Sequence, residues 1–242
     1  MCDFLDSFDY EEPLSLYIHV PFCDSKCSYC AFFSVSGYRD DVKSRYVSRL
    51  VGELGELVER MEGRPFETAY IGGGSPGCLD VRSLYEIAGL VCRNGRPKEF
   101  TVEMNPDNLS PNVKCLFDGL FTRLSLGVQS LDERALKFLG RNATLEQTYH
   151  GLELSQDIGA STDCELSYDL MTCLGPWHDP LKDVQTLCNG FPSNHLSVYA
   201  LTLEEGTPLF KRRPPLPDDD TQASMLCSVW NALEGRGFEH YE

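Results

Sequence analysis

Six short strand-like runs alternate with helix-like segments, and this alternation limits the possible folds of the chain more than any other feature. The runs are rich in β-branched and aromatic residues and lie at 16–20, 68–71, 100–104, 123–128, 165–171 and 196–203. Apolar residues at helical spacing occupy 46–58, 84–91, 145–158 and 181–187 between them. Strands joined by crossovers pair in parallel within one sheet. The pattern predicts an α/β fold, an open, partial (β/α)6 barrel of the TIM type.

Polar or glycine residues punctuate the ends of these runs. They are Cys23 after the first run, the glycines at 72–74 after the second, Glu103 and Asn105 at the third, Gln129 at the fourth, Asp169 in the fifth and Tyr199 in the sixth. In barrels of parallel strands, functional groups gather where the loops converge over the C-terminal strand ends. We therefore expect the functional site at this end of the sheet.

Cys23, Cys27 and Cys30 share one short loop with the spacing C-x3-C-x2-C. Three thiolates on a four-iron cluster leave one iron without a protein ligand. S-adenosylmethionine can chelate that iron through its amino and carboxylate groups, and an electron from the cluster can cleave its sulfonium bond to give a 5′-deoxyadenosyl radical. The loop is therefore expected to hold a [4Fe–4S] cluster and, at the open iron, S-adenosylmethionine.

The alternative for this loop is a zinc site completed by His19 or by a distant cysteine. Structural zinc sites usually pair two short knuckles, and the sequence has no second knuckle. The other eight of the 11 cysteines are scattered singly and are interpreted as mostly structural. His19, at the end of the first run, is likewise interpreted as a structural group and not as a metal or haem ligand.

The glycines at 72–74, followed by Ser75, suggest a close approach between backbone and ligand. Glycine permits such an approach, and free N–H groups in such a turn can bind a carboxylate. A tight turn without a ligand is the alternative. Glu103 and Asp169 are acceptors suited to ribose hydroxyls or an ammonium group, and Gln129 and Arg141 are donors suited to a carboxylate. Surface or salt-bridged positions are the alternative for each of these.

Composition excludes some partners. The net charge of −16 over 242 residues disfavours nucleic acid and anionic membranes. No apolar stretch is long enough to span a membrane, and the acidic N-terminus lacks the basic and apolar regions of a signal peptide. The sequence therefore predicts a cytoplasmic protein. The basic run at 211–213 is the exception to the acidic balance and could meet an anionic group.

Three regions follow from these patterns. Residues 1–13 are expected to be an N-terminal lead-in, and residues 14–210 the core barrel. Residues 211–242 are expected to contain a Pro-rich linker, a helix at about 221–235 and the start of a truncated C-terminal region.

Seven motifs resemble the radical-SAM family of oxygen-independent coproporphyrinogen III oxidases and related haem chaperones, the HemN/HemW family. They lie at 17–23, 71–76, 103–106, 123–130, 139–141, 169–171 and 199–208. The resemblance implies a partial radical-SAM barrel with the cluster at its top. It also implies that Tyr17, Tyr29, Gly73, Gly74, Ser75 and Glu103 bind S-adenosylmethionine and that Gln129, Arg141 and Asp169 complete this cofactor region.

Phe32 favours one branch of that family. In the oxidase branch a fourth cysteine follows the third after one residue, and here that position holds Phe32. Together with the short N-terminus, this resembles the chaperone branch and implies a protein of tetrapyrrole metabolism that carries haem as cargo to an acceptor protein. Porphyrinogen decarboxylation, or an inactive truncated remnant, are the alternatives. The loop at 172–178 and the absence of the family's C-terminal domain depart from the family pattern.

Overall fold

The computed structural model describes residues 12–241. Its six strands form one parallel sheet in the order β1-β2-β3-β4-β5-β6, so that each strand pairs with its neighbours in the sequence. The strands are β1 (Ser15–Val20), β2 (Thr68–Gly73), β3 (Glu99–Met104), β4 (Arg123–Gln129), β5 (Glu165–Thr172) and β6 (His195–Ala200). The open, partial barrel predicted from the alternation is confirmed, although β6 ends at Ala200 and not at residue 203.

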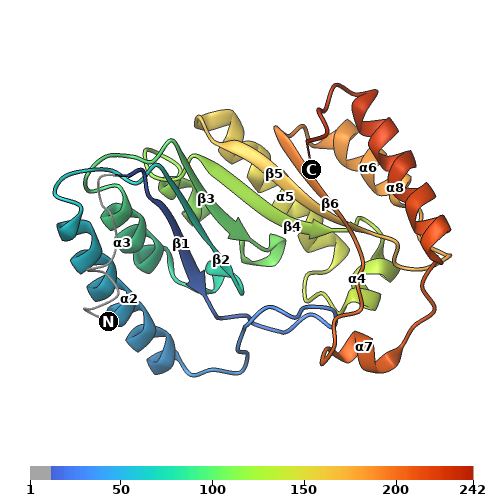
Figure 1. Cartoon of the computed structure of the whole chain (residues 1–242), viewed down its shortest axis with the longest axis horizontal. Coiled ribbons are helices and arrows are strands. Elements are labelled where there is room, and N and C mark those ends of the chain that lie inside the picture. Colours follow the sequence, from blue (N-terminus) through green and yellow to red (C-terminus); the bar gives the residue numbers. More distant parts are fainter. Residues whose placement is uncertain (1–11, 242) are drawn as a thin grey trace.

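Helices connect the strands at most crossovers. They are α2 (Asp40–Arg60), α3 (Val81–Val91), α4 (Glu133–Leu139), α5 (Leu145–Ser161), α6 (Pro180–Gly190), α7 (Pro208–Arg212) and α8 (Asp219–Glu234). Figure 1 shows α2 and α3 beside β1 and β2, with α6 and α8 beside β6 at the other end of the sheet. The short helices α4 and α7 were not predicted, because neither is long enough for a clear helical period.

The crossover between β3 and β4 is the exception, because it contains two short 3-10 helices and no α-helix. After η1 (Pro76–Cys78), which follows β2, the chain forms η2 (Pro106–Asn108) and η3 (Pro111–Leu116) in this crossover. Each begins with a proline, which fixes the first turn but cannot donate a backbone hydrogen bond. A short turn therefore stands directly at the C-terminal end of β3.

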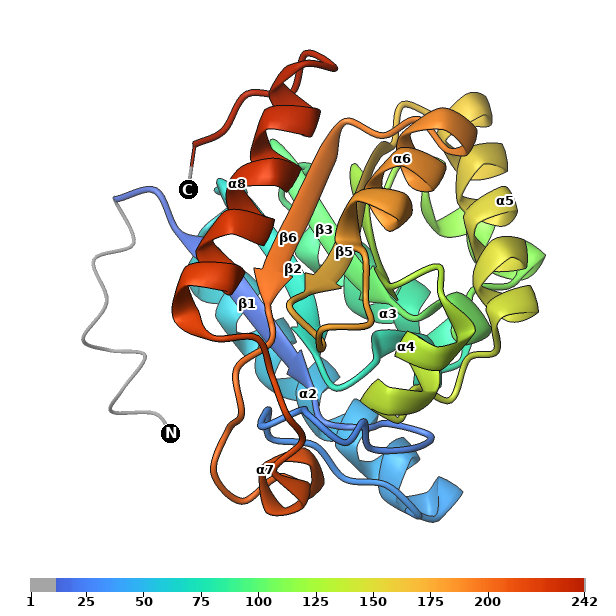
Figure 2. The ribbon, with the colours of Figure 1, turned by 90° about the vertical axis from the view of Figure 1, so that its right-hand side faces the viewer.

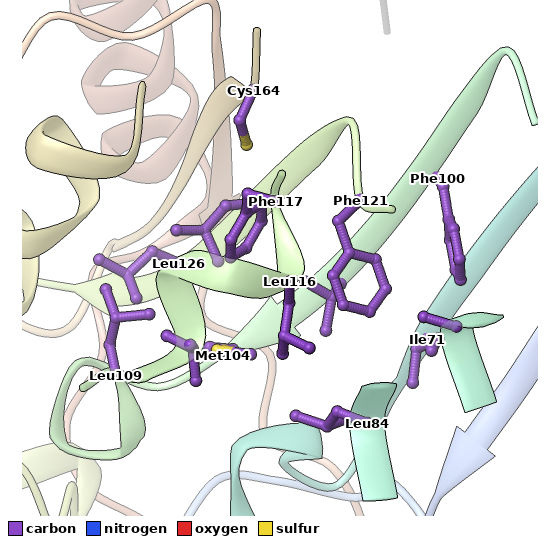
Figure 3. Close-up of a cluster of buried hydrophobic side chains, with 14 of the residues drawn as sticks. Ile71, Leu84, Phe100, Met104, Leu109, Leu116, Phe117, Phe121, Leu126 and Cys164 are labelled. Carbon is purple, nitrogen blue, oxygen red and sulfur yellow. The ribbon is translucent and has the colours of Figure 1, made fainter. Parts of the chain in front are cut away.

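Alternation along the strands separates an apolar outer face from a polar inner face. Successive strand side chains point to opposite sides, so Phe100 and Val102 of β3 enter the hydrophobic core while Thr101 and Glu103, which alternate with them, do not. Figure 3 shows this core, in which Ile71, Leu84 and Phe121 lie among the buried side chains packed behind the sheet. The inner face keeps polar groups from neighbouring strands, including Glu103, Ser125 and Asp169.

Most of the predicted N-terminal lead-in, residues 1–11, lies outside the described residues. A Pro-rich segment leads from α7 to α8 (Figure 2), and α8 packs against α6 (Figure 1). Within residues 12–241 no helix is long and apolar enough to cross a membrane.

Candidate functional site

A cavity of about 630 Å³ opens at the C-terminal ends of the strands, and the cysteine loop forms one of its walls. The loop leaves β1 and runs across the end of the sheet toward α4 and α7 (Figures 1 and 2). Nearly all of the predicted site residues line this cavity: Cys23, Cys27, Cys30, Tyr29, Gly73, Gly74, Ser75, Glu103, Gln129, Arg141 and Asp169. Convergence over the strand ends therefore brings together residues that are far apart in the sequence.

Tyr17 is the predicted residue that the structure does not place on the cavity wall. Its side chain is 58% exposed, its ring stacks on Tyr70, and its hydroxyl lies 3.1 Å from His19 Nδ1. The other ring nitrogen of His19, Nε2, lies 2.9 Å from the Phe33 carbonyl oxygen. Both ring nitrogens thus have protein partners, as expected for the structural interpretation of His19, and neither is left over to complete a zinc site.

Backbone hydrogen bonds anchor the cysteine loop at its start and in its middle. Cys23 N–H donates to the Val35 carbonyl at 3.0 Å, and Ser28 N–H donates to the Leu139 carbonyl at 2.9 Å. Leu209 N–H, at the start of α7, donates to the Ser28 carbonyl at 2.8 Å. Helices α4 and α7, which the sequence did not predict, therefore hold the middle of the loop.

The glycine segment at 72–74 lines the cavity and also forms backbone hydrogen bonds to the start of the cysteine loop. Gly74 N–H donates to the Val20 carbonyl and Ser75 N–H to the Phe22 carbonyl, both at 2.7 Å. A Cβ atom on Gly74 would lie 2.5 Å from the Phe22 oxygen. The expectation that these N–H groups face a ligand was wrong for Gly74 and Ser75, because both are used to bind the end of β1 to the end of β2.

The two predicted acceptors lie on adjacent parts of the inner wall. Glu103 accepts hydrogen bonds from the Tyr70 hydroxyl at 2.5 Å and from Gly73 N–H at 3.2 Å. Asp169 accepts a long hydrogen bond from the Ser125 hydroxyl at 3.4 Å. Burial, and then the nearby charge of Glu103, raise the pKa of Asp169 to about 6. Two carboxylates in one cavity attract hydroxyl and ammonium donors.

Gln129 reaches the cavity from an irregular end of β4. The register between β4 and β5 shifts between Leu126 and Gln129, and Gln129 has φ of +68°. A non-glycine residue in this left-handed region costs about 1–3 kcal/mol and is typical of functional sites, and such bulges redirect side chains. The irregularity turns the Gln129 amide toward the cavity. A Cβ atom added to Gly127 would lie only 3.0 Å from Gln129 Nε2.

Arg141 is half-buried and lies between the polar groups of the cavity wall and the cysteine loop. Its Nη2 donates to Asn105 Oδ1 at 2.7 Å and to the Gly127 carbonyl at 2.8 Å, and its Nη1 lies 3.5 Å from Cys27 Sγ. Its Nε is buried with no hydrogen-bond partner in the described part of the chain. Nearby, burial raises the pKa of the Tyr29 hydroxyl, which stays neutral beside the guanidinium.

The arrangement of the three thiols suits a cluster better than a single ion. In the part of the chain that the structure describes, no three His, Cys, Asp or Glu side chains converge on one metal-ion position. The thiolates of an iron–sulfur cluster bind different irons. They therefore need to line one cavity, but they need not converge on a single metal position. Cys23, Cys27 and Cys30 do share one, and the buried unpartnered Arg141 Nε beside them is suited to an anionic ligand.

Comparison with known proteins shows the family of the chain. The Radical SAM superfamily profile matches residues 17–180, which include all three cysteines and Asp169. The chain belongs to the radical SAM superfamily. It is 34% identical over 238 residues to the heme chaperone HemW of Escherichia coli K12, and 32% identical over 242 residues to HemW of Lactococcus lactis. These alignments cover 95% and 96% of this radical SAM chain.

The fold of this radical SAM protein is also that of a solved enzyme. Coproporphyrinogen III oxidase (HemN) from Escherichia coli superposes with a TM-score of 0.83 over 99% of this chain, at 22% identity. The chain spans 61% and 62% of the length of the two HemW relatives and 57% of the HemN chain. The HemN/HemW resemblance seen in the motifs is thus confirmed over about three fifths of those proteins.

Sequence analysis did not identify the residues that hold the cysteine loop in place. Asn105 and Asn108 at the end of β3, Ser28 in the loop and Gly140 after α4 make the contacts. The signal for Asn105 was present in the motif at 103–106, in which only Glu103 was interpreted. Asn108 and Ser28 gave no signal, because their partners are known only from the fold.

Proposed function

We propose that this chain holds a [4Fe–4S] cluster on Cys23, Cys27 and Cys30 and binds S-adenosylmethionine beside it. Membership in the superfamily and the shared cavity of the three thiols support this assignment. When bound, the cluster would supply the electron for reductive chemistry on the sulfonium cofactor. The finer function of the chain depends on what else the cavity accepts.

Different residues of the chain would bind different groups of S-adenosylmethionine. Glu103 and Asp169 offer carboxylate oxygens to the hydroxyl or ammonium groups of the cofactor, and Gln129 and Arg141 offer N–H donors to its carboxylate. Arg141 is charged at all working pH values and presents its fork in a fixed orientation. The hydrogen bonds that Arg141 donates to Asn105 Oδ1 and to the Gly127 carbonyl hold that orientation before the cofactor arrives.

We further propose that the protein binds haem and delivers it to an acceptor protein. The observation that carries this proposal is Phe32, a 71% exposed aromatic side chain on the cavity wall, at the position where oxidase-type relatives have a fourth cysteine. A flat apolar side chain at the mouth suits a porphyrin macrocycle, whereas a thiol would suit catalysis. The names of the HemW relatives support the same function. A cytoplasmic location remains a prediction.

Oxidative decarboxylation of coproporphyrinogen III is the second candidate, favoured by the likeness to the HemN fold. Two assays on the anaerobically reconstituted protein separate the candidates. Haem titration followed by visible absorbance should saturate at about one haem per chain if the chaperone function holds. Coproporphyrinogen III should then remain unchanged in the presence of dithionite and S-adenosylmethionine, and conversion to protoporphyrinogen IX would overturn the proposal.

Phe33 provides a matched control for the place of haem binding. It is 72% exposed, as Phe32 is, but it does not line the cavity. Phe32→Ser should weaken haem binding clearly more than Phe33→Ser. Equal losses would indicate binding by the exposed surface in general and not at the cavity mouth.

A further inference from the structure

The turn after β3 contacts the cysteine loop on two sides. This turn, residues 105–108, begins at Asn105 and contains η2. On one side Asn105 Oδ1 accepts from Arg141, whose guanidinium lies against Cys27. On the other side Asn108 contacts Asp24, the residue that directly follows Cys23. The turn therefore joins the loop next to the first and second predicted ligands.

Asn108 uses both ends of its amide. Its Nδ2 donates to Asp24 Oδ2 at 2.8 Å, and its Oδ1 accepts from the Ser75 hydroxyl at 2.8 Å. Ser75 is 2% exposed, and its N–H already donates to Phe22 at the start of the cysteine loop. A carboxylate can only accept and this serine hydroxyl is donating, so the orientation of the amide is fixed by its partners.

Neighbouring residues leave room for the Asn108 side chain and hold its partner Asp24. A Cβ atom on Gly77 would lie 2.6 Å from Asn108 Cβ, so only glycine leaves room for the side chain there. Tyr38 holds the other oxygen of the same carboxylate, with its hydroxyl 3.3 Å from Asp24 Oδ1. Three segments, the turn after β3, the glycine segment after β2 and the loop itself, thus meet through one amide and one carboxylate.

We propose that Asn108 is a positioning residue for the cluster loop: by fixing the Asp24 carboxylate it holds Cys23 and Cys27 ready to receive the cluster. This inference rests on the proposed cluster and concerns residues that do not touch it. Asp24 is exposed and Asn108 is half-buried, so their hydrogen bond contributes little to the hydrophobic core. Outer-shell partners of metal ligands typically change affinity about 10- to 100-fold when they are removed.

A charge exchange tests the pair. Asn108→Asp places a second carboxylate against Asp24, and the protein should then lose its cluster about tenfold faster to a chelator under anaerobic conditions. The double variant Asp24→Asn/Asn108→Asp exchanges amide and carboxylate, so every hydrogen bond to Ser75 and Tyr38 can re-form. It should restore the rate of cluster loss to near that of the wild type. Asn142→Asp makes the same charge change against Asp107, a partner in the same turn and not in the cysteine loop, and should have a much smaller effect.

Three measurements decide the outcome: iron content, the rate of cluster bleaching at visible wavelengths, and the melting temperature of the cluster-free protein. Support requires faster cluster loss in Asn108→Asp, rescue in the double variant and an unchanged melting temperature. Normal cluster retention in Asn108→Asp, failure of the exchange to rescue, or a large fall in the cluster-free melting temperature would each overturn the positioning role. A wild-type protein that takes up no iron would instead overturn the proposed cluster.

Discussion

Arg141 and Cys27 lie in contact, with Nη1 of the guanidinium 3.5 Å from the sulfur, although 114 residues separate them in the sequence. The contact depends on α4, which ends at Gly140 in a left-handed conformation with φ of +68°. A Cβ atom on Gly140 would lie 3.1 Å from Ser28 Cβ. Glycine at this helix end thus lets α4 approach the cysteine loop and directs Arg141 toward the thiol.

Removing the Arg141 charge should shift the cluster potential. In Arg141→Ala the reduced cluster, which carries one more negative charge, loses a half-buried positive neighbour, so the reduction potential should fall. Arg141→Lys keeps the charge but loses the fork to Asn105 and Gly127, so its potential should lie nearer that of the wild type. A redox titration followed by electron paramagnetic resonance measures both. Equal potentials in all three proteins would contradict the electrostatic role.

Each cysteine of the loop should be required for iron binding. Anaerobic reconstitution of the wild type should give about four irons per chain, and Cys23→Ala, Cys27→Ala or Cys30→Ala should each reduce this sharply. Cys115 and Cys227 are exposed free cysteines that do not line the cavity, so Cys115→Ala and Cys227→Ala are matched controls that should load normally. One zinc per chain, with no iron bound, would contradict the cluster.

Gly74→Ala should damage the cluster loop itself. Its Cβ atom would lie 2.5 Å from the Phe22 oxygen and 2.9 Å from the Val20 oxygen, so the backbone before Cys23 must move. Iron content after reconstitution should fall, and not only the affinity for S-adenosylmethionine. Gly89 in α3 has no atom within 4 Å of the same position, so Gly89→Ala should load normally and gain about 0.5–1 kcal/mol of stability. Full iron content in Gly74→Ala would contradict this reading.

Asp169 should make stability depend on pH. Its pKa is raised from 3.8 to about 6 in the folded chain, so its contribution to stability is fully present below about pH 4 and is lost as the pH rises through 6. Asp169→Asn should therefore stabilise the cluster-free protein at pH 8, by about 3 kcal/mol at most, and much less at pH 4. Chemical denaturation at the two pH values measures the difference.

The same variant should weaken cofactor binding, because an amide cannot replace both acceptor oxygens. In the wild type, binding that uses the Asp169 carboxylate should also decline as the pH falls below about 6. For the stability prediction, an equal gain in Asp169→Asn at pH 4 and at pH 8 would show that the charge of Asp169 is not the cause of the gain.

The three residues of the basic run at 211–213 should have two different roles, one in holding the cysteine loop and one in attracting haem. Arg212 Nη2 donates to Ser28 Oγ at 3.0 Å and to the Phe138 carbonyl at 3.1 Å, so Arg212→Ala should disturb the cysteine loop and lower iron retention. Lys211 and Arg213 are exposed. Lys211→Ala/Arg213→Ala should retain iron and weaken haem uptake, more at low ionic strength, where attraction to the haem propionates is least screened. Haem affinity unaffected by the double variant would remove that role.

The sequence alone determined the strands, the cysteine loop and most of the cavity residues. Alternation of apolar runs and helical segments is a local property, and parallel pairing then brings the strand ends to one edge of the sheet. For that reason Glu103, Gln129 and Asp169, which lie on three different strands, could be assigned to one site before any contact was known. Short elements such as α4 and α7 fell below the length at which a helical period is visible.

Only the tertiary structure decided what each of these residues does. The partners of the cysteine loop are remote in sequence: Asp24 and Asn108 are 84 residues apart, and Ser28 and Arg212 are 184 apart. Such contacts depend on how α4, α7 and the turn after β3 close over the sheet, which no local pattern encodes. The same reason explains why Gly74 proved to pack against Phe22, and why Tyr17 lies outside the cavity wall.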